Sequence, residues 1–184
     1  MLSDIMIEQD IEIPVALQSG PVIASLLGDK LRLSLRVKSR NRAAIAKTLG
    51  ITLPSEIGAT SRKGESLSAC LGPDEWIFIG DKSNYFELYE TALKLSSNYI
   101  MSAVDVSSRN VGIILTGQAA SETINVGCPL DLSLVAFPVG KCTRTVYEAA
   151  PILLYRKSET SFMVECWRSF APYVIGLMDA HTKG

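Results

Sequence analysis

The sequence contains little of the chemistry on which most enzymes depend. Its 184 residues include one histidine, His181, and four cysteines that stand singly without a Cys-x-x-Cys pair, at Cys70, Cys128, Cys142 and Cys166. Zinc sites and disulfide frameworks need clustered or paired ligands. No Gly-x-Ser-x-Gly, P-loop or Gly-x-Gly-x-x-Gly motif occurs. The sequence therefore predicts no catalytic, cofactor-binding or metal site in this chain, and cysteines that are buried and reduced.

Long hydrophobic runs and an excess of either charge are also missing. The longest apolar runs, at 22–27 and 173–178, fall far short of the roughly 20 residues that a membrane helix needs. The formal net charge is −1, and no basic stripe alternates with aromatic residues, which argues against nucleic-acid binding. The first residues carry acids instead of the basic and apolar regions of a secretory signal. We therefore expect a cytoplasmic chain that binds neither membrane nor nucleic acid.

The residues that are present predict a globular α+β protein, with 47% hydrophobic and 20% charged residues. Residues 1–30 are apolar without a period and are interrupted by proline and glycine. We expect them to form an irregular segment that packs on the core of this chain or on a partner. In the strand that follows, Leu31 and Leu33 alternate with Arg32 and Ser34, which predicts a buried face and a solvent face that carries Arg32.

Residues 31–106 predict the order β-α-β-β-α-β, the split βαβ of a ferredoxin-like fold. The expected strands are 31–38, 67–71, 76–79 and 100–106, the expected helices are 41–49 and 83–95, and 51–66 is an expected loop. Gly50 is placed to end the first helix.

Residues 107–184 repeat this order with insertions, which predicts one compact unit of two interlocked ferredoxin-like halves. The expected strands are 111–115, 141–147, 152–156 and 162–167, and the expected helices are 118–126 and 170–181. Gly127 is expected to be a left-handed stop for the third helix. The buried stripe expected for the last helix includes Phe170, Tyr173, Val174, Leu177, Met178 and His181.

Three charged residues need an explanation. Asp105 and Glu165 lie on strands that are otherwise suited to burial, so each either faces solvent or binds a partner or ligand. Arg168 precedes a helix N-terminus, where a cation opposes the helix dipole. It either forms a salt bridge with a carboxylate such as Asp131 or contacts another subunit.

Several blocks of the sequence resemble a known family. They are CLGPDEW at 70–76, VDVSSRNVGIILTG at 104–117, GCPLDL at 127–132, AFPVGKCTRT at 136–145 and WRSFAPYV at 167–174. In this order they are similar to the gamma subunit of heterotetrameric sarcosine oxidase. The resemblance implies a fold like the folate-binding module of the glycine-cleavage aminomethyltransferase. It also implies a non-catalytic, structural subunit of a complex that oxidatively demethylates sarcosine to glycine.

The resemblance further implies partners and their cofactors. The partners would be the alpha, beta and delta subunits, which would hold FAD, FMN, NAD and zinc and use tetrahydrofolate, with no cofactor in this chain. We expect the partner interface to include Arg109, Arg168 and Phe170, together with the apolar N-terminal segment, because arginine beside aromatic residues is typical of interface hot spots.

Two alternatives stay open from the sequence. The first is a stand-alone folate or one-carbon binding protein in which Asp105 or Glu165 contacts the pterin. Related single-chain folate-binding proteins carry Lys-Gly-Cys-Tyr-x-Gly-Gln-Glu where this chain has Gly140-Lys141-Cys142-Thr143-Arg144-Thr145-Val146, so the Gly-Gln-Glu is missing. The second alternative is an enzyme that uses one of the cysteines.

Overall fold

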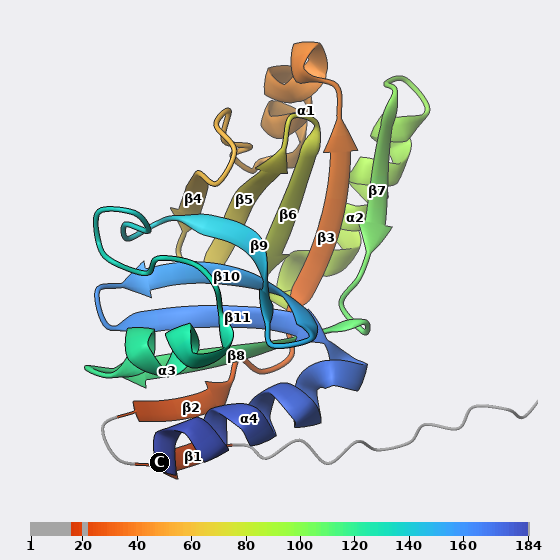
Figure 1. Cartoon of the computed structure of the whole chain (residues 1–184). Coiled ribbons are helices and arrows are strands. Elements are labelled where there is room, and N and C mark those ends of the chain that lie inside the picture. Colours follow the sequence, from red (N-terminus) through yellow and green to blue (C-terminus); the bar gives the residue numbers. More distant parts are fainter. Residues whose placement is uncertain (1–15, 20–21, 184) are drawn as a thin grey trace, which may run out of the picture.

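Two antiparallel sheets pack face to face, and helices cover the outer face of each. This architecture is that of a computed structural model, which describes residues 16–19 and 22–183. Helices α1 (Arg42–Leu49) and α2 (Tyr85–Ser96) pack on a five-stranded sheet, and α3 (Ala120–Gly127) and α4 (Ala171–Lys183) pack on a six-stranded sheet. The strands of the two sheets cross one another (Figure 1). The α+β prediction is confirmed.

The five-stranded sheet is formed by the first half of the chain. Its strands are β3 (Leu31–Val37), β4 (Thr60–Lys63), β5 (Ser66–Gly72), β6 (Glu75–Gly80) and β7 (Met101–Asp105), in the spatial order β4-β5-β6-β3-β7. Because β6 lies between β3 and β5, and β3 between β6 and β7, both helical connections are split βαβ units. The ferredoxin-like order predicted for this half is therefore present. Strand β4 lies inside the predicted loop 51–66. The sequence analysis missed this strand because its residues are polar and show no apolar alternation.

The six-stranded sheet combines the second half of the chain with its N-terminal region. Its strands are β1 (Ala16–Ser19), β2 (Val22–Leu26), β8 (Asn110–Gly117), β9 (Cys142–Tyr147), β10 (Ala150–Ser158) and β11 (Ser161–Trp167), in the order β1-β2-β8-β11-β10-β9. Residues 22–26 pair with 113–117, so β2 lies between β8 and the edge strand β1. The prediction that residues 1–30 are irregular is therefore wrong for the part that the structure describes. These short strands are separated by glycine and proline. They extend the sheet whose other four strands come from the second half of the chain.

Three apolar clusters hold these layers together. One lies between each sheet and its helices, and a third fills the space between the sheets with residues that include Ile77, Ile79, Leu153 and Met163. Strand β6 is buried along its whole length, because its alternate side chains face α1 and α2 on one side and the second sheet on the other.

Two glycines expected to end helices behave differently. Gly50 ends α1, as predicted, and its φ of 66° places it in the left-handed conformation. Gly127 is the last residue of α3 and has no positive φ, so that prediction is wrong. A Cβ at Gly127 would lie 3.0 Å from the ring of Tyr147. The glycine therefore lies at a close contact between α3 and β9, where a side chain would press on the Tyr147 ring, and sequence spacing does not reveal this contact.

The buried stripe of α4 is rotated relative to the prediction. Three short 3₁₀ turns, η1 (Ser39–Asn41), η2 (Lys82–Asn84) and η3 (Arg168–Phe170), precede α1, α2 and α4. Because η3 takes up the first residues, α4 begins at Ala171 and buries Val174, Ile175 and Met178, whereas Tyr173 is 44% exposed.

Candidate docking surface

The structure brings the three predicted interface residues together around an exposed tryptophan. Trp167 ends β11, Arg168 and Phe170 lie in η3, and Arg109 lies in the turn between β7 and β8. The Arg109 guanidinium lies 6.0 Å from the centre of the Trp167 ring, and the Phe170 ring centre lies 6.1 Å from it on a tilted plane. We refer to Arg109, Trp167, Arg168 and Phe170 as the Trp167 cluster.

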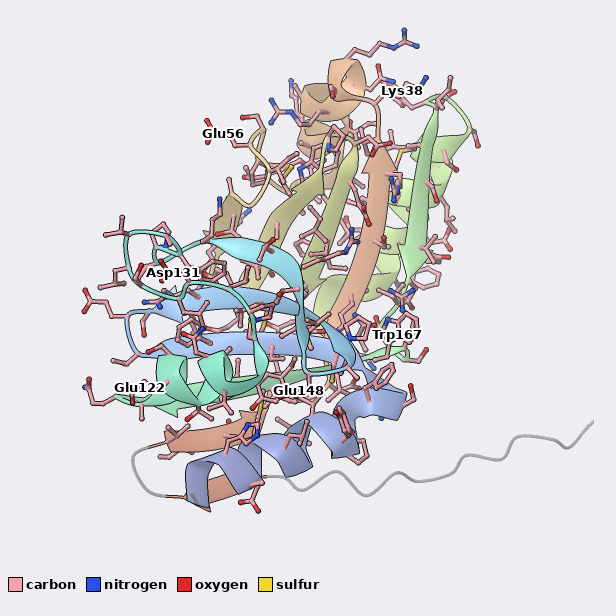
Figure 2. The ribbon with its side chains drawn as sticks, viewed as in Figure 1. Lys38, Glu56, Glu122, Asp131, Glu148 and Trp167 are labelled. Carbon is pink, nitrogen blue, oxygen red and sulfur yellow. The ribbon has the colours of Figure 1, made fainter. Side chains whose placement is uncertain are left out.

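Exposure makes the Trp167 cluster unusual. Trp167 is 48% exposed although it carries the largest apolar side chain, while Trp76, the other tryptophan, is 1% exposed. Figure 2 shows Trp167 at the outer edge of the molecule, where β11 ends and α4 begins. Phe170 is half-buried and packs on the core beneath α4. The cluster is therefore anchored at its base and presents an aromatic ring with two exposed guanidinium groups to solvent. Sequence reasoning missed Trp167, although its place directly before Arg168 in the sequence was a usable signal.

Arg168 has a local role that the sequence did not predict. Its backbone N–H donates to Arg109 O at 2.7 Å and its Nε to Ser108 O at 3.0 Å. Asp131 lies on the opposite side of the molecule from Trp167 (Figure 2) and accepts a hydrogen bond from the Ser133 N–H at 2.8 Å. The salt bridge proposed with Asp131 is therefore absent. The Arg168 side chain ties the β7–β8 turn to the end of β11 and stays exposed.

The apolar N-terminal segment was the fourth part of the predicted interface. Residues 1–15 lie outside the described residues, so that part of the prediction stands without a structural account. Strands β1 and β2 lie at the edge of the six-stranded sheet, and Ile23 on β2 is 48% exposed.

Glu165 takes neither of the two environments expected for it. It lies between the sheets, 2% exposed, and its two oxygens accept hydrogen bonds from Arg32 Nε at 2.6 Å and Arg32 Nη2 at 2.8 Å. Burial raises the pKa of the Glu165 carboxyl, and the hydrogen bonds from Arg32 oppose that shift. Arg32 itself is 2% exposed, so the expected solvent face of β3 is wrong at this position. The pair joins the two sheets.

Space for this ion pair comes from a glycine. Gly112 on β8 is paired with Glu165 on β11, and a Cβ there would lie 2.5 Å from Glu165 Oε1 and 2.8 Å from a methyl carbon of Leu27. Asp105, the other questioned carboxylate, accepts hydrogen bonds from the backbone N–H of Ser107 at 2.8 Å and from its hydroxyl at 2.5 Å. Both carboxylates are thus engaged within the chain.

A second carboxylate connects the sheets near the opposite end of β3. Glu75 on β6 accepts two hydrogen bonds from Arg144 on β9, one of them at 2.9 Å, and Arg36 lies 3.1 Å from the same carboxylate. The hydrogen bonds from Arg144 hold the pKa of the Glu75 carboxyl below its ordinary value of 4.5, against an opposing effect of burial.

We expect a Glu75→Gln variant to lose part of the acid sensitivity of the fold. Because the folded-state pKa of Glu75 is lowered, its contribution to stability is complete above the unfolded pKa and is lost as pH falls below about 4.5. The variant should be less stable than the native chain at neutral pH, and the difference should shrink on acidification. Urea unfolding from about pH 7 to about pH 3 measures it. Glu122→Gln, an exposed change on α3, is the control. A difference that stays constant with pH would contradict the assignment.

The remaining candidates for chemistry are structural in the described part of the chain. All four cysteines are free and buried, as predicted, and burial raises the pKa of the Cys142 and Cys166 thiols to about 12. His181 Nδ1 lies 2.8 Å from the hydroxyl of buried Tyr147, which ties the end of α4 to β9. Over residues 16–19 and 22–183, no three His, Cys, Asp or Glu side chains are arranged to hold a metal. No helix among these residues has the length and apolarity to cross a bilayer.

The fold and the exposed cluster define a class, an α+β protein of two packed ferredoxin-like halves with an aromatic–arginine surface. The model of the sarcosine oxidase, gamma subunit family matches residues 37–183, and the chain belongs to this family. Sarcosine oxidase subunit gamma from Arthrobacter sp. is 29% identical over 147 residues, 79% of this chain and 71% of the relative. The protein of that name from Corynebacterium sp. (strain P-1) is 29% identical over 77% of this chain and 70% of its own length.

Solved structures show the same fold. A chain of heterotetrameric sarcosine oxidase from Corynebacterium sp. U-96 superposes with a TM-score of 0.81 at 24% identity, over 90% of this chain and 86% of that one. Aminomethyltransferase T of the glycine cleavage system from Bartonella henselae superposes with a TM-score of 0.64 at 11% identity, over 85% of this chain and 45% of that one. The expected likeness to the aminomethyltransferase fold is confirmed.

Proposed function

We propose that this chain is the gamma subunit of a heterotetrameric sarcosine oxidase and that it acts by docking through the Trp167 cluster. Family membership and the structural similarity of 90% of this chain to a chain of a heterotetrameric sarcosine oxidase support the assembly. The observation that carries the docking role is the exposed Trp167 between Arg109 and Phe170. Tryptophan and arginine are the residues most enriched among interface hot spots.

In this proposal the chemistry belongs to the partners. The alpha, beta and delta subunits would hold FAD, FMN, NAD and zinc and use tetrahydrofolate, and would carry out the oxidative demethylation of sarcosine to glycine. The chain itself would be structural and non-catalytic, because the nucleophilic and titratable candidates that the structure describes are buried or hydrogen-bonded within the fold. The four free cysteines support a reducing compartment, the cytoplasm.

The test is assembly of the complex from coexpressed subunits. We expect Trp167→Ala, Arg109→Ala and Arg168→Ala each to weaken association with the partner subunits by about 1–2 kcal/mol, or roughly five- to thirty-fold in Kd. Arg109 and Trp167 are exposed, so their variants should leave the stability of the isolated chain within about 1 kcal/mol of native. Co-purification yield, Kd and thermal unfolding of each isolated variant provide the comparison.

Matched controls separate the cluster from exposed residues in general. Phe86→Ala removes a 74% exposed aromatic on α2, and Arg40→Ala removes an exposed arginine in η1. Both should assemble as the native chain does. Cluster variants that assemble normally would rule out this surface. A native chain that associates with none of the three subunits would overturn the proposed function, and tetrahydrofolate binding by that chain in calorimetry would support the folate-binding alternative.

A further inference from the structure

A cavity of about 430 Å³ opens on the helix side of the five-stranded sheet, and its lining includes no residue of the Trp167 cluster. Its floor is formed by the β4–β5 hairpin, one wall by the end of α1 with the residues after it, and the opposite wall by the first turns of α2. Its size falls within the roughly 300–1,000 Å³ that is usual for pockets that bind small molecules.

The floor is polar because of the strand register. Ser61 pairs with Ser68 and Lys63 pairs with Ser66, and residues two apart on a strand face the same side of a sheet. All four side chains therefore reach the cavity. Ser68 is 3% exposed, and it adds a hydroxyl to those of Ser61 and Ser66 on this floor. Serine hydroxyls both donate and accept hydrogen bonds, so this floor is suited to a molecule with hydrogen-bonding groups.

Two opposite charges face the cavity from different walls. Lys63 lies on the floor and Glu87 on the first turn of α2, and neither forms an ion pair within the described residues. Asp81 also lines the cavity, but Lys30 is bound to it. Leu49 and Leu88 add apolar surface on the two helix walls.

We propose that this cavity binds a small zwitterion of the amino-acid class. Its carboxylate would pair with Lys63 and its ammonium group with Glu87, while its side chain would lie over the serine floor between Leu49 and Leu88. A simple anion would meet Glu87 and a simple cation would meet Lys63, whereas a molecule that carries both charges is attracted by both residues. The inference concerns ligand binding and does not rest on the proposed assembly role.

Calorimetry with the purified full chain tests this inference. The probes are glycine, sarcosine, L-serine, L-threonine and L-glutamine. We expect at least one to bind with a Kd of about 1 mM or below. The N-acetyl and the carboxamide derivatives of that probe each lack one charge, and they should bind roughly tenfold more weakly. Absence of binding by all five at about 10 mM would overturn the proposal, as would equal binding of the derivatives.

Variants locate the site. Lys63→Met and Glu87→Gln are exposed changes that should leave the fold intact and weaken binding about tenfold each. Lys94→Met on the outer side of α2 and Glu122→Gln on α3 are matched exposed controls and should bind as the native chain does. Binding that survives both cavity variants would place the ligand elsewhere and refute this site. Because the measurement uses the isolated chain, either outcome leaves the docking proposal to its own test.

Discussion

Replacing Glu165 with alanine is expected to lower the free energy of unfolding by about 3–5 kcal/mol, the range for removing one partner of a buried ion pair. The cause is the positive charge of Arg32, which would stay buried without its partner. Arg32 is 2% exposed, and both guanidinium nitrogens that bond Glu165 would lose their acceptor between the sheets. Burying an unpaired cation costs more than the pair itself contributes, since the pair also had to be desolvated.

A double variant distinguishes this cause from simple loss of packing. Arg32→Met combined with Glu165→Leu removes both charges and keeps side-chain volume, so it should be clearly more stable than Glu165→Ala. Glu159→Ala, an exposed change after β10, should be nearly neutral. Urea unfolding measures all four proteins. A Glu165→Ala variant within about 1 kcal/mol of the native chain would contradict a buried, uncompensated Arg32.

The same experiment tests whether the chain is one folding unit. We propose that residues 31–106, residues 107–184 and the N-terminal segment unfold together, because the sheets share a buried cluster and the Arg32–Glu165 pair. Trp76 reports on the five-stranded sheet and Trp167 on the six-stranded sheet. Single-tryptophan variants of each kind should show coincident unfolding midpoints. Separate midpoints would mean that the halves are independent.

The second large effect is expected from a single methyl group. Gly112→Ala should destabilise the chain by about 3 kcal/mol, the upper end of the usual range for overpacking. The added Cβ would lie 2.5 Å from Glu165 Oε1 and 2.8 Å from Leu27, so the variant both crowds the core and displaces a carboxylate from Arg32.

A glycine in an open environment provides the control of opposite sign. Gly176 lies within α4, and a Cβ built there meets no atom within 4 Å. Gly176→Ala should stabilise the chain by about 0.4–1 kcal/mol through the lower entropy of the unfolded state. Thermal and urea unfolding of the two variants give the comparison. A Gly112→Ala variant as stable as the native chain would show that Glu165 can move without cost, which would also weaken the preceding prediction.

The local spacing of apolar residues was sufficient to predict the strands and helices that bury one continuous face. The alternation of Leu31, Leu33, Leu35 and Val37 identified β3, and these four side chains are all at most 1% exposed. The βαββαβ order of the first half followed in the same way, since strand and helix periods differ and each leaves its own spacing of apolar residues. Gly50 was identified as a helix end for a similarly local reason, and it ends α1 in the structure.

Contacts between residues distant in the sequence were beyond this reasoning. Arg32 and Glu165 are 133 positions apart, so a cation on an alternating strand was assigned to solvent, although it is buried against a carboxylate of the other sheet. Gly127 was assigned to a left-handed helix cap, whereas in the structure the nearby ring of Tyr147 leaves little room for a Cβ at this position. Strand β2 was missed for the same reason, because its partner β8 lies some ninety residues later in the chain.

The candidate docking surface shows the same division. The sequence by itself determined which residue types were available, and arginine beside aromatic residues was enough to select Arg109, Arg168 and Phe170. Only the tertiary structure placed Arg109 against Trp167. The β7–β8 turn lies beside the end of β11 because the backbone N–H of Arg168 donates a hydrogen bond to the carbonyl oxygen of Arg109. The cavity over Lys63 and Glu87 likewise depends on a hairpin and a helix brought together by the sheet. The spacing of apolar residues along the chain indicates which face of a strand or helix is buried. Which residues lie against that face depends on which strands pair and which layers pack.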